Sequence, residues 1–334
     1  MKIVGIGGGT GLPVLLAGLK ELQRDGQGSF DITAIVTVSD SGGSTGALRE
    51  AFGMPAVGDI RKCMIALAPE HAVLASVCEH RFDNPESFAG HSVGNLILSA
   101  LYQMSGNFAA AVQMASELLE LEGRVLPATD APVTLCAFYE DDRIVRGESN
   151  VPRPGCRIRR VWFDTPNPPA SPGVLDVLKD ADAIVLGPGS LYTSIVPNLL
   201  VAGVVDGIQN SAAIKIYVCN LMTQPGETDG YTSADHLKAL LEYLPAVDIC
   251  VLNCADIGMG VAERYLRSGS EIVSGTEEDE DQIRRSGVLP VAAPLLKRGE
   301  IKARHDPATL ARLVVSLARG FAGVQEIICQ GNRR

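Results

Sequence analysis

The sequence predicts an α/β protein with a Rossmann-like, doubly wound and mainly parallel sheet. Short segments rich in β-branched residues alternate with segments of helical apolar spacing along most of the chain. In addition, 46% of the residues are hydrophobic but only 5% are aromatic, a balance that suits parallel strands covered by helices on both faces. We expect the 334 residues to form a single domain.

The expected strands are short apolar runs, at Lys2–Gly7, Ile32–Ser39, Asp182–Gly187, Ile214–Asn220, Val247–Asn253 and Val288–Ala292. The expected helices between them carry apolar residues on one face, at Pro13–Arg24, Pro197–Asn210, Ser233–Leu244 and Gly260–Arg267. Because strands and helices alternate, consecutive strands should run parallel with a helix crossing between them.

Two segments depart from this alternation. Residues 58–121 carry almost entirely helical patterns, which predicts a helical insertion. Residues from about 125 to 165 carry short strand candidates separated by turn residues, at Val133–Tyr139, Arg143–Glu148 and Ile158–Phe163. They predict a small antiparallel β extension.

Charge and cysteine content exclude several classes of protein. The formal charge of −10 argues against a nucleic-acid partner, and the basic run Arg157–Arg160 is too short to reverse that. The eight cysteines show no C-x-x-C spacing, and several lie inside apolar runs, which is typical of buried thiols in a reducing compartment. The glycine-broken N-terminus does not fit a signal peptide, and no apolar run is long enough for a membrane span. We expect a cytoplasmic protein without membrane insertion.

A glycine-rich turn joins the first strand to the first helix. Its residues Gly8, Gly9, Thr10 and Gly11 would present main-chain amides at a helix N-terminus, a favourable seat for phosphate. The alternative is that these glycines only let helix and strand pack closely. The dinucleotide fingerprint fails, because Thr10 or Leu12 stands in its last glycine position, and no Gly-Lys pair provides a phosphate loop. An NAD(P)-dependent oxidoreductase is therefore a weaker hypothesis, and no tightly bound redox cofactor is expected.

Small and polar residues follow five of the expected strands. Carboxyl ends of parallel strands meet at one edge of a sheet, so these loops should line a common crevice suited to phosphate oxygens. Beyond the first turn, the predicted ligand contacts in these loops are Ser41, Gly42, Ser44, Gly187, Gly189, Ser190, Leu191, Tyr192, Thr193, Asn220, Thr223 and Asn253.

Two carboxylates are candidates for a metal site. Asp40 follows the second strand and Asp59 begins a helix; together with bound phosphates they could hold Mg²⁺, the one candidate cofactor. The alternative is that Asp59 only caps its helix and Asp40 only satisfies turn amides. Arg61 could hold a phosphate or lie on the surface of its helix.

Another helix N-terminus follows Gly90-His91-Ser92-Val93-Gly94-Asn95. Asn95 is a candidate ligand contact. His91, with Asp40 and Asp59, is a candidate catalytic residue, as a general acid or base. A hydrogen-bonded structural histidine is the alternative for His91, because no nucleophile stands at a suitable spacing.

These segments together resemble the gluconeogenesis factor family (YvcK-like proteins), which is related to the 2-phospho-L-lactate transferases (CofD). The matching stretches are IGGGTGL, VTVSDSGGSTGALRE, GDIRKCMIAL, GHSVGNL, GRVLPAT, RGESNVP, GPGSLYTSIVPNLLV and VCNLMTQPGETDGYTSADH, from the start to about His236. The loop GPGSLYTSI is similar to the factor branch.

The resemblance implies a Rossmann-like fold with a nucleotide crevice. For the factor branch it implies binding of UDP-sugars and a role in cell shape during gluconeogenic growth, without a settled catalytic activity. For the transferase branch it implies Mg²⁺-dependent transfer of 2-phospholactate, with metal carboxylates at Asp40 and Asp59 and a phosphate loop from Gly187 to Thr193. Where the family usually carries two consecutive aspartates, this chain has Asp40-Ser41.

Two functions therefore compete. The first is a regulatory protein whose partner is a nucleotide or nucleotide-sugar. The second is an Mg²⁺-dependent phosphotransferase of the 2-phospho-L-lactate transferase type. The sequence identifies neither the base nor the sugar, and the apolar face of Leu310–Phe321 would serve a homo-oligomer contact as well as the core.

Overall fold

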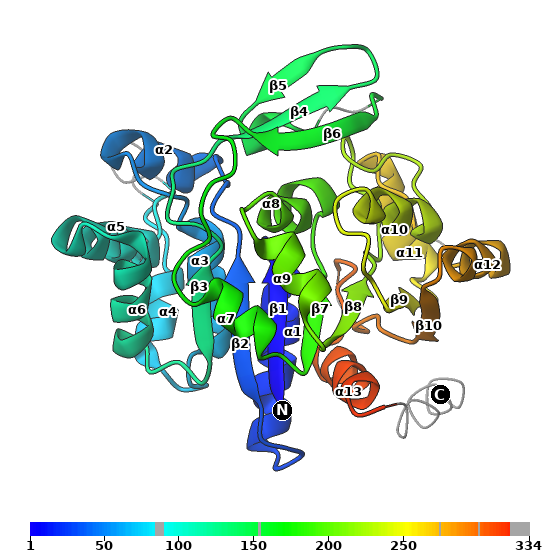
Figure 1. The fold of residues 1–334 in the computed structure, drawn as a ribbon, viewed down its shortest axis with the longest axis horizontal. Helices are drawn as coiled ribbons and strands as arrows, with labels where there is room; N and C mark the ends of the chain where they lie inside the picture. The colour runs from blue at the N-terminus through cyan, green and yellow to red at the C-terminus, as the bar shows by residue number, and fades with distance from the viewer. Residues whose placement is uncertain (84–89, 153–154, 274, 300, 321–334) are drawn as a thin grey trace.

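A seven-stranded parallel sheet forms the centre of the computed structural model, which describes residues 1–83, 90–152, 155–273, 275–299 and 301–320 (Figure 1). The strand order is β10-β9-β8-β7-β1-β2-β3, and every pair is parallel. The strands are β1 Lys2–Gly7, β2 Asp31–Val36, β3 Arg124–Pro127, β7 Ala183–Leu186, β8 Ile214–Val218, β9 Ile249–Asn253 and β10 Leu289–Ala293. The predicted Rossmann-like α/β fold is confirmed.

The winding of the sheet reverses next to its central strand. The chain leaves β1 through β2 to β3, returns to place β7 on the other side of β1, and then continues outward to β10. Because crossover connections are right-handed, the two winding directions place their helices on opposite faces of the sheet. The gap between the carboxyl ends of β1 and β7 is therefore a topological switch point, where open α/β sheets bind ligands.

Helices cover both faces. The helices are α1 Leu12–Arg24, α2 Gly43–Phe52, α3 Gly58–Leu67, α4 Val73–Glu79, α5 Val93–Ser105, α6 Phe108–Leu118, α7 Val174–Lys179, α8 Val196–Leu199, α9 Val204–Asn210, α10 Ser233–Leu241, α11 Met259–Arg267, α12 Glu277–Arg285 and α13 Pro307–Ala318. Helices α7, α8 and α9 lie in front of the sheet in Figure 1, and α1 packs with α3 and α13.

The core explains why β1 and α1 form where they do. Strand β1 is buried from Ile3 to Gly7, so its continuous apolar run serves both faces of the sheet. Helix α1 buries Leu12, Leu15, Leu16 and Leu19 completely. The facing side of α13 is equally buried, through Leu310, Leu313, Val314 and Leu317. From the sequence, the apolar face of Leu310–Phe321 could have served an oligomer contact or the core. Over its described residues it packs in the core, and its last residue, Phe321, lies outside the described residues.

A second, three-stranded antiparallel sheet lies at the top of Figure 1, above the carboxyl ends of the main strands. Its order is β5-β4-β6, with β4 Leu135–Tyr139, β5 Ile144–Arg146 and β6 Ile158–Phe163. Alternation along β4 and β6 buries Ala137, Tyr139 and Val161 on the side facing the domain. A 3₁₀ turn at Glu148–Asn150 follows β5.

Three local features differ from the sequence prediction. Residues 124–127 were expected in the antiparallel extension but form β3, paired with β2 at the edge of the main sheet. Helix α2 begins at Gly43, within a segment expected to be a loop. The helix expected over Pro197–Asn210 is interrupted: α8 ends at Leu199, and α9 begins after Gly203, whose φ of +80° is left-handed.

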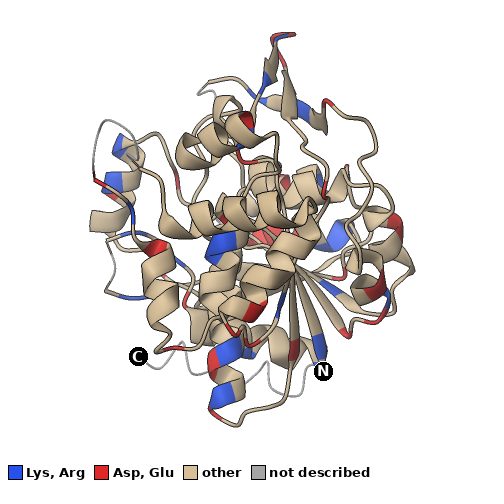
Figure 2. Ribbon diagram, turned by 90° about the vertical axis from the view of Figure 1, so that its left-hand side faces the viewer, with Lys and Arg blue, Asp and Glu red and all other residues tan. Residues whose placement is uncertain are grey.

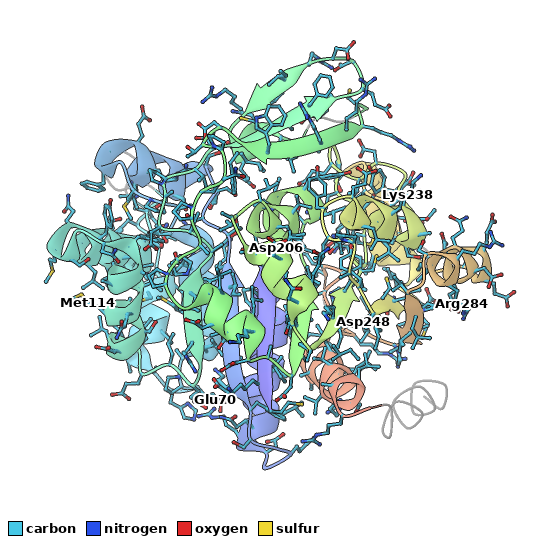
Figure 3. All side chains as sticks on the ribbon, viewed as in Figure 1. Glu70, Met114, Asp206, Lys238, Asp248 and Arg284 are labelled. Atoms are coloured by element: carbon cyan, nitrogen blue, oxygen red, sulfur yellow. The ribbon has the colours of Figure 1, made fainter. Side chains whose placement is uncertain are left out.

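Charged residues lie mainly on the outer helices and loops. Figure 2 shows blue and red segments mixed over the outside of the molecule, while the central strands are almost entirely tan. In Figure 3, Met114 on α6 and Arg284 on α12 mark opposite flanks of the structure. Within the described ranges, none of the helices has the length and apolar character needed to cross a bilayer.

Candidate functional site

A cavity of about 440 Å³ opens at the switch point between β1 and β7. Its lining residues come from the turn after β1 and the start of α1, the 3₁₀ turn after β5, the segments after β7 and β8, helix α11 and a segment before α13: Gly9, Thr10, Gly11, Val14, Glu148, Pro188, Gly189, Ser190, Thr193, Ser194, Asn220, Leu221, Met222, Thr223, Gln224, Glu227, Tyr265, Ala303, Arg304 and His305. A cavity of this size is within the usual range for a small-molecule site.

The two glycine loops approach each other at backbone distance. A Cβ on Gly11 would overlap the carbonyl oxygen of Pro188 and lie 2.9 Å from the nitrogen of Gly189. Gly9 has a left-handed φ of +62°. Glycine is therefore required here by close packing and by conformation, and Gly9, Gly11 and Gly189 all line the cavity. The packing role and the proposed ligand role are compatible.

A buried carboxylate lies beneath the loop that follows β7. The hydroxyl of Ser190 donates to Glu227, and the hydroxyl of Thr193 lies 2.6 Å from the Ser190 oxygen and 3.3 Å from a Glu227 oxygen. Glu227 is only 5% exposed, and this burial raises the pKa of its carboxyl to about 7. The loop hydroxyls are thus ordered by a carboxyl that changes charge near neutral pH.

Of the two predicted metal carboxylates, Asp59 lies beside the first glycine turn, and neither is among the residues that line the cavity. Asp59 accepts a hydrogen bond of 2.7 Å from the nitrogen of Gly9 and pairs with Lys62 at 2.8 Å. Asp40 accepts from the nitrogen of Gly42 at 2.9 Å. A Cβ on Gly8 would lie 2.7 Å from an Asp59 oxygen, so this glycine leaves room for the carboxylate.

Glu148, on the 3₁₀ turn of the antiparallel sheet, adds a further carboxylate to the cavity wall. Burial, followed by the nearby charge of Asp40, raises the pKa of Glu148 to about 7. Burial and the charge of Asp59 also raise the pKa of Asp40. Within the described ranges, no three His, Cys, Asp or Glu side chains are grouped to hold a metal ion. A divalent ion would need ligand oxygens as well as Asp40 and Asp59.

A separate polar network joins α2, α3 and α5. His91 Nδ1 lies 2.9 Å from the hydroxyl of Ser44, which accepts from the Asn95 amide at 3.2 Å. The guanidinium of Arg61 donates to the Asn95 carbonyl at 3.0 Å and is largely buried. None of these four residues lines the cavity. The guanidinium of Arg61 is thus directed toward α5, away from the glycine turns.

Several predicted contact residues have structural partners elsewhere. Leu191 and Tyr192 are buried, and the Tyr192 hydroxyl lies 3.0 Å from that of Tyr231. Ser41 bonds the 3₁₀ turn through Ser149. Asn253 bridges Ala255 and the nitrogen of Leu295. Predicted residues that do line the cavity are Gly9, Thr10, Gly11, Gly189, Ser190, Thr193, Asn220 and Thr223, and their role in ligand binding remains a prediction.

Sequence reasoning missed five charged or titratable residues of the cavity: Glu148, Glu227, Tyr265, Arg304 and His305. Glu227 directly follows Gly226 at the end of a polar loop expected in the crevice, which could have indicated it, whereas the other four lie outside the five polar loops. The stretch RGESNVP contains Glu148, but its position above the cavity depends on how the antiparallel sheet folds back. Burial lowers the pKa of His305 to about 4, which keeps its imidazole neutral.

Comparison with known proteins identifies the family. The model of the 2-phospho-L-lactate transferase CofD family matches residues 3–296 of this chain. The chain belongs to the CofD family. Both glycine turns and both carboxylates described above lie inside the matched region.

Within the CofD family, the similar curated proteins are bacterial. The Bacillus subtilis protein named gluconeogenesis factor is 41% identical over 320 residues, which cover 95% of this chain and 98% of that protein. A Thermotoga maritima protein, whose curated name also contains "gluconeogenesis factor", is 44% identical over 326 residues, covering 96% of this chain and 100% of its own length.

The fold is shared with a solved structure. A crystal structure of a UPF0052 family member from Bacillus halodurans superposes with a TM-score of 0.88 at 38% identity, covering 94% of this chain and 99% of that one. The resemblance to the gluconeogenesis factors and to CofD is therefore confirmed at the level of family and fold.

Proposed function

We propose that this CofD family member is a cytoplasmic binding protein for a nucleotide-sugar of the UDP-sugar class. In this proposal it acts as a gluconeogenesis factor that supports cell shape during gluconeogenic growth. The observation that carries the binding role is the meeting of two glycine turns, Gly9–Gly11 and Pro188–Ser190, in one cavity at the switch point. The curated names of similar proteins support the cellular role.

The charges of the cavity fit a ligand held through main-chain groups. Gly9, Thr10 and Gly11 line the cavity at the start of α1, where the positive end of the helix favours a diphosphate, although the Gly9 amide itself donates to Asp59. Arg304 adds one cation at the wall. Amides of Asn220 and Gln224, which lie 3.5 Å apart, could recognise hydroxyl or base groups of the ligand.

Calorimetry with UDP-N-acetylglucosamine tests this proposal. Saturable binding is expected for the parent protein and none for Gly9→Asp, which adds strain at a left-handed φ and a negative charge beside Ser194. Gly26→Asp is the matched control, because Gly26 also has a left-handed φ of +71° but faces open space. No heat with any UDP-sugar, or equal loss in both variants, would reject the proposal.

The positions of Asp40 and Asp59 favour one second candidate, an Mg²⁺-dependent phosphotransferase. Asp59 lies beside Gly8 and Asp40 beside Gly58, and the charge of Asp59 contributes to the raised pKa of Asp40. In this alternative they would hold Mg²⁺ together with ligand phosphates, and the ion would supply positive charge to the transferred group. Lys62 already neutralises part of Asp59, so this chain could also hold phosphates without a metal.

Metal titration separates the two candidates. If the phosphotransferase alternative holds, MgCl₂ added with GDP should bind to the parent and much more weakly to Asp59→Asn, and product should form from a suitable donor. Asp31→Asn removes a carboxylate at the opposite end of the strands, where it pairs with Arg124, and should change neither property. A nucleotide affinity that changes neither with Mg²⁺ nor in the Asp59→Asn variant would favour the binding protein.

A further inference from the structure

A second cavity of about 440 Å³ lies beside the first, beyond the carboxyl ends of β9 and β10. Its residues come from the loop after β9, from α11 and from the loop that follows β10: Cys254, Ala255, Asp256, Ile257, Val261, Pro294, Leu296, Lys297, Arg298, Gly299, Lys302 and Ala303. None of the glycine turns of the candidate site contributes to it. It is therefore a separate space with its own chemistry.

Positive charge dominates this second cavity. Among the lining residues that the structure describes, Lys297, Arg298 and Lys302 face one carboxylate, Asp256, one oxygen of which accepts from the nitrogen of Gly258 at 2.8 Å. Arg298 and Lys302 form no ion pair with any residue in the described part of the chain. In a protein with a formal charge of −10, two unpaired cations at one cavity leave local charge available for an anion.

Hydrogen bonds to main-chain groups hold the basic loop in place. Arg264 on α11 donates to the carbonyl of Ile301 at 2.8 Å, and the nitrogen of Ala303 donates to the Tyr265 hydroxyl at 3.1 Å. At the base of the loop, the nitrogen of Lys297 donates to the carbonyl of Arg304 at 2.8 Å. The side chains of Arg298 and Lys302 are thus free to contact a ligand without loss of the loop's own bonds.

The opposite wall is also fixed. Asn253 accepts hydrogen bonds from the nitrogens of Ala255 and Leu295, which ties the loop after β9 to the loop after β10. The wall shared with the first cavity is apolar, because Ile257, Val261 and Leu296 pack with Leu221, Met222, Tyr265 and Ala303. An apolar floor below cations suits a small molecule that carries both a carbon skeleton and an anionic group.

We propose that this second cavity binds a small phosphorylated metabolite of sugar-phosphate size. Arg298 and Lys302 would hold its phosphate, while the apolar wall near Val261 contacts the remainder of the molecule. Guanidinium and ammonium groups are the side chains best suited to a phosphate group. Because Ala303 lines both cavities, an occupant here lies against the wall of the candidate nucleotide site. The proposal does not depend on what the first cavity binds.

Cys254 provides a local test. Cys254 is exposed and lines this cavity. Cys156, between β5 and β6 of the antiparallel sheet, is partly buried and does not line it. Alkylation by iodoacetamide is followed at each of the two cysteines by mass spectrometry, with and without D-ribose 5-phosphate. We expect ribose 5-phosphate to slow alkylation of Cys254 saturably and to leave the alkylation rate of Cys156 unchanged. Neither ribose without phosphate nor a chloride salt at equal ionic strength should slow alkylation of Cys254.

Charge variants identify the residues responsible. The double variant Arg298→Gln with Lys302→Gln should weaken protection by about tenfold or more in ribose 5-phosphate concentration. The matched control Lys179→Gln with Lys238→Gln removes two exposed cations on α7 and α10 and should leave protection unchanged; Lys238 is labelled in Figure 3. The Gly9→Asp variant should also retain protection of Cys254, and this result would distinguish the second cavity from the proposed nucleotide site.

Three results would overturn the proposal. They are an alkylation rate at Cys254 that ribose 5-phosphate leaves unchanged, equal slowing by ribose alone, or full protection in the double variant. Circular dichroism of each variant checks that the fold is retained, and the Cys156 rate in the same sample reports any general change in accessibility. A loss of protection restricted to the double variant supports the assignment.

Discussion

The hydroxyl of Ser190 donates a hydrogen bond to the carboxyl of Glu227, which joins the loop after β7 to the segment after β8. Both residues are more than nine-tenths buried. Because Glu227 has a pKa raised to about 7 by burial, its charge beneath the proposed phosphate loop depends on pH in the physiological range. An anion at Ser190 would be repelled by the ionised carboxylate and tolerated by the protonated form.

Glu227→Gln should therefore remove much of the pH dependence of ligand binding. In the parent, affinity for UDP-N-acetylglucosamine should fall as the pH rises through about 7, because Glu227 loses its proton. The variant, which keeps the size of the side chain but carries no charge, should bind almost equally at either side of that pH. Calorimetry across the range checks this, and parallel profiles for parent and variant would contradict it.

The same carboxyl affects stability with a defined sign. A glutamate whose pKa is raised from 4.5 to about 7 in the folded protein contributes stability that is fully present below pH 4.5 and lost as the pH rises through about 7. Glu148 behaves in the same direction. Glu227→Gln should thus reduce the fall in melting temperature across this window without abolishing it. A steeper fall in the variant would show that the sign is wrong.

Gly11→Ala tests the contact between the two glycine loops. The added methyl would overlap the Pro188 carbonyl, and we expect a loss of about 1–3 kcal/mol in the free energy of unfolding together with loss of ligand binding. Gly260→Ala is the control, because a Cβ on this helical glycine meets nothing within 4 Å. It should leave stability unchanged or slightly raised. Denaturant unfolding of both variants measures the difference.

Asn198→Ala tests how the start of α8 is attached to β1. The fully buried Asn198 amide donates to the carbonyls of Gly7, Ser194 and Ile195, at 3.2, 2.8 and 3.3 Å. Its removal leaves three carbonyl acceptors with fewer donors and should cost about 1–3 kcal/mol in the free energy of unfolding. Asn210→Ala, at the exposed end of α9, should cost far less. Similar losses in both variants would argue against a special role for Asn198.

Tyr265→Phe tests whether the two cavities communicate. The Tyr265 hydroxyl lies at the first cavity and accepts a hydrogen bond from Ala303, which lines both. If ribose 5-phosphate alters the affinity for UDP-N-acetylglucosamine in the parent, the variant should show a smaller change, because Ala303 is less firmly connected to α11. Calorimetry with and without ribose 5-phosphate measures the effect. An identical change in both proteins would place the coupling elsewhere.

The sequence predicts the sheet well because parallel strands must be apolar on both faces. Strand β1 was expected at its observed bounds, and β9 differs only at its start, since buried runs leave a continuous signal. Strand β3 was not among the expected strands, and the region assigned to the antiparallel extension began at about its position, because a run as short as Arg124–Pro127 does not reveal which sheet it joins. Helix α2 was missed because its first residues, Gly43 and Ser44, are typical of a loop.

The site was predicted in part for a related reason. Glycines at Gly9 and Gly11 are visible in the sequence because close approach removes side chains there. Glu227 directly follows a loop expected in the crevice, whereas His305 reaches the cavity through packing between segments distant along the chain, which no local pattern records. Asn253 was expected in the same crevice, but the loop after β9 turns toward the second cavity, and its amide organises that wall instead.

Glu148 lies on the turn of the small antiparallel sheet, where a side chain can reach the cavity without being part of the packed core. The buried side of the small sheet belongs to the same apolar core as the parallel strands, through Ala137, Tyr139 and Val161, whereas the turn that carries Glu148 contributes no residue to that core. A substitution at Glu148 would therefore alter the charge at the cavity wall while both sheets and every glycine turn stay intact.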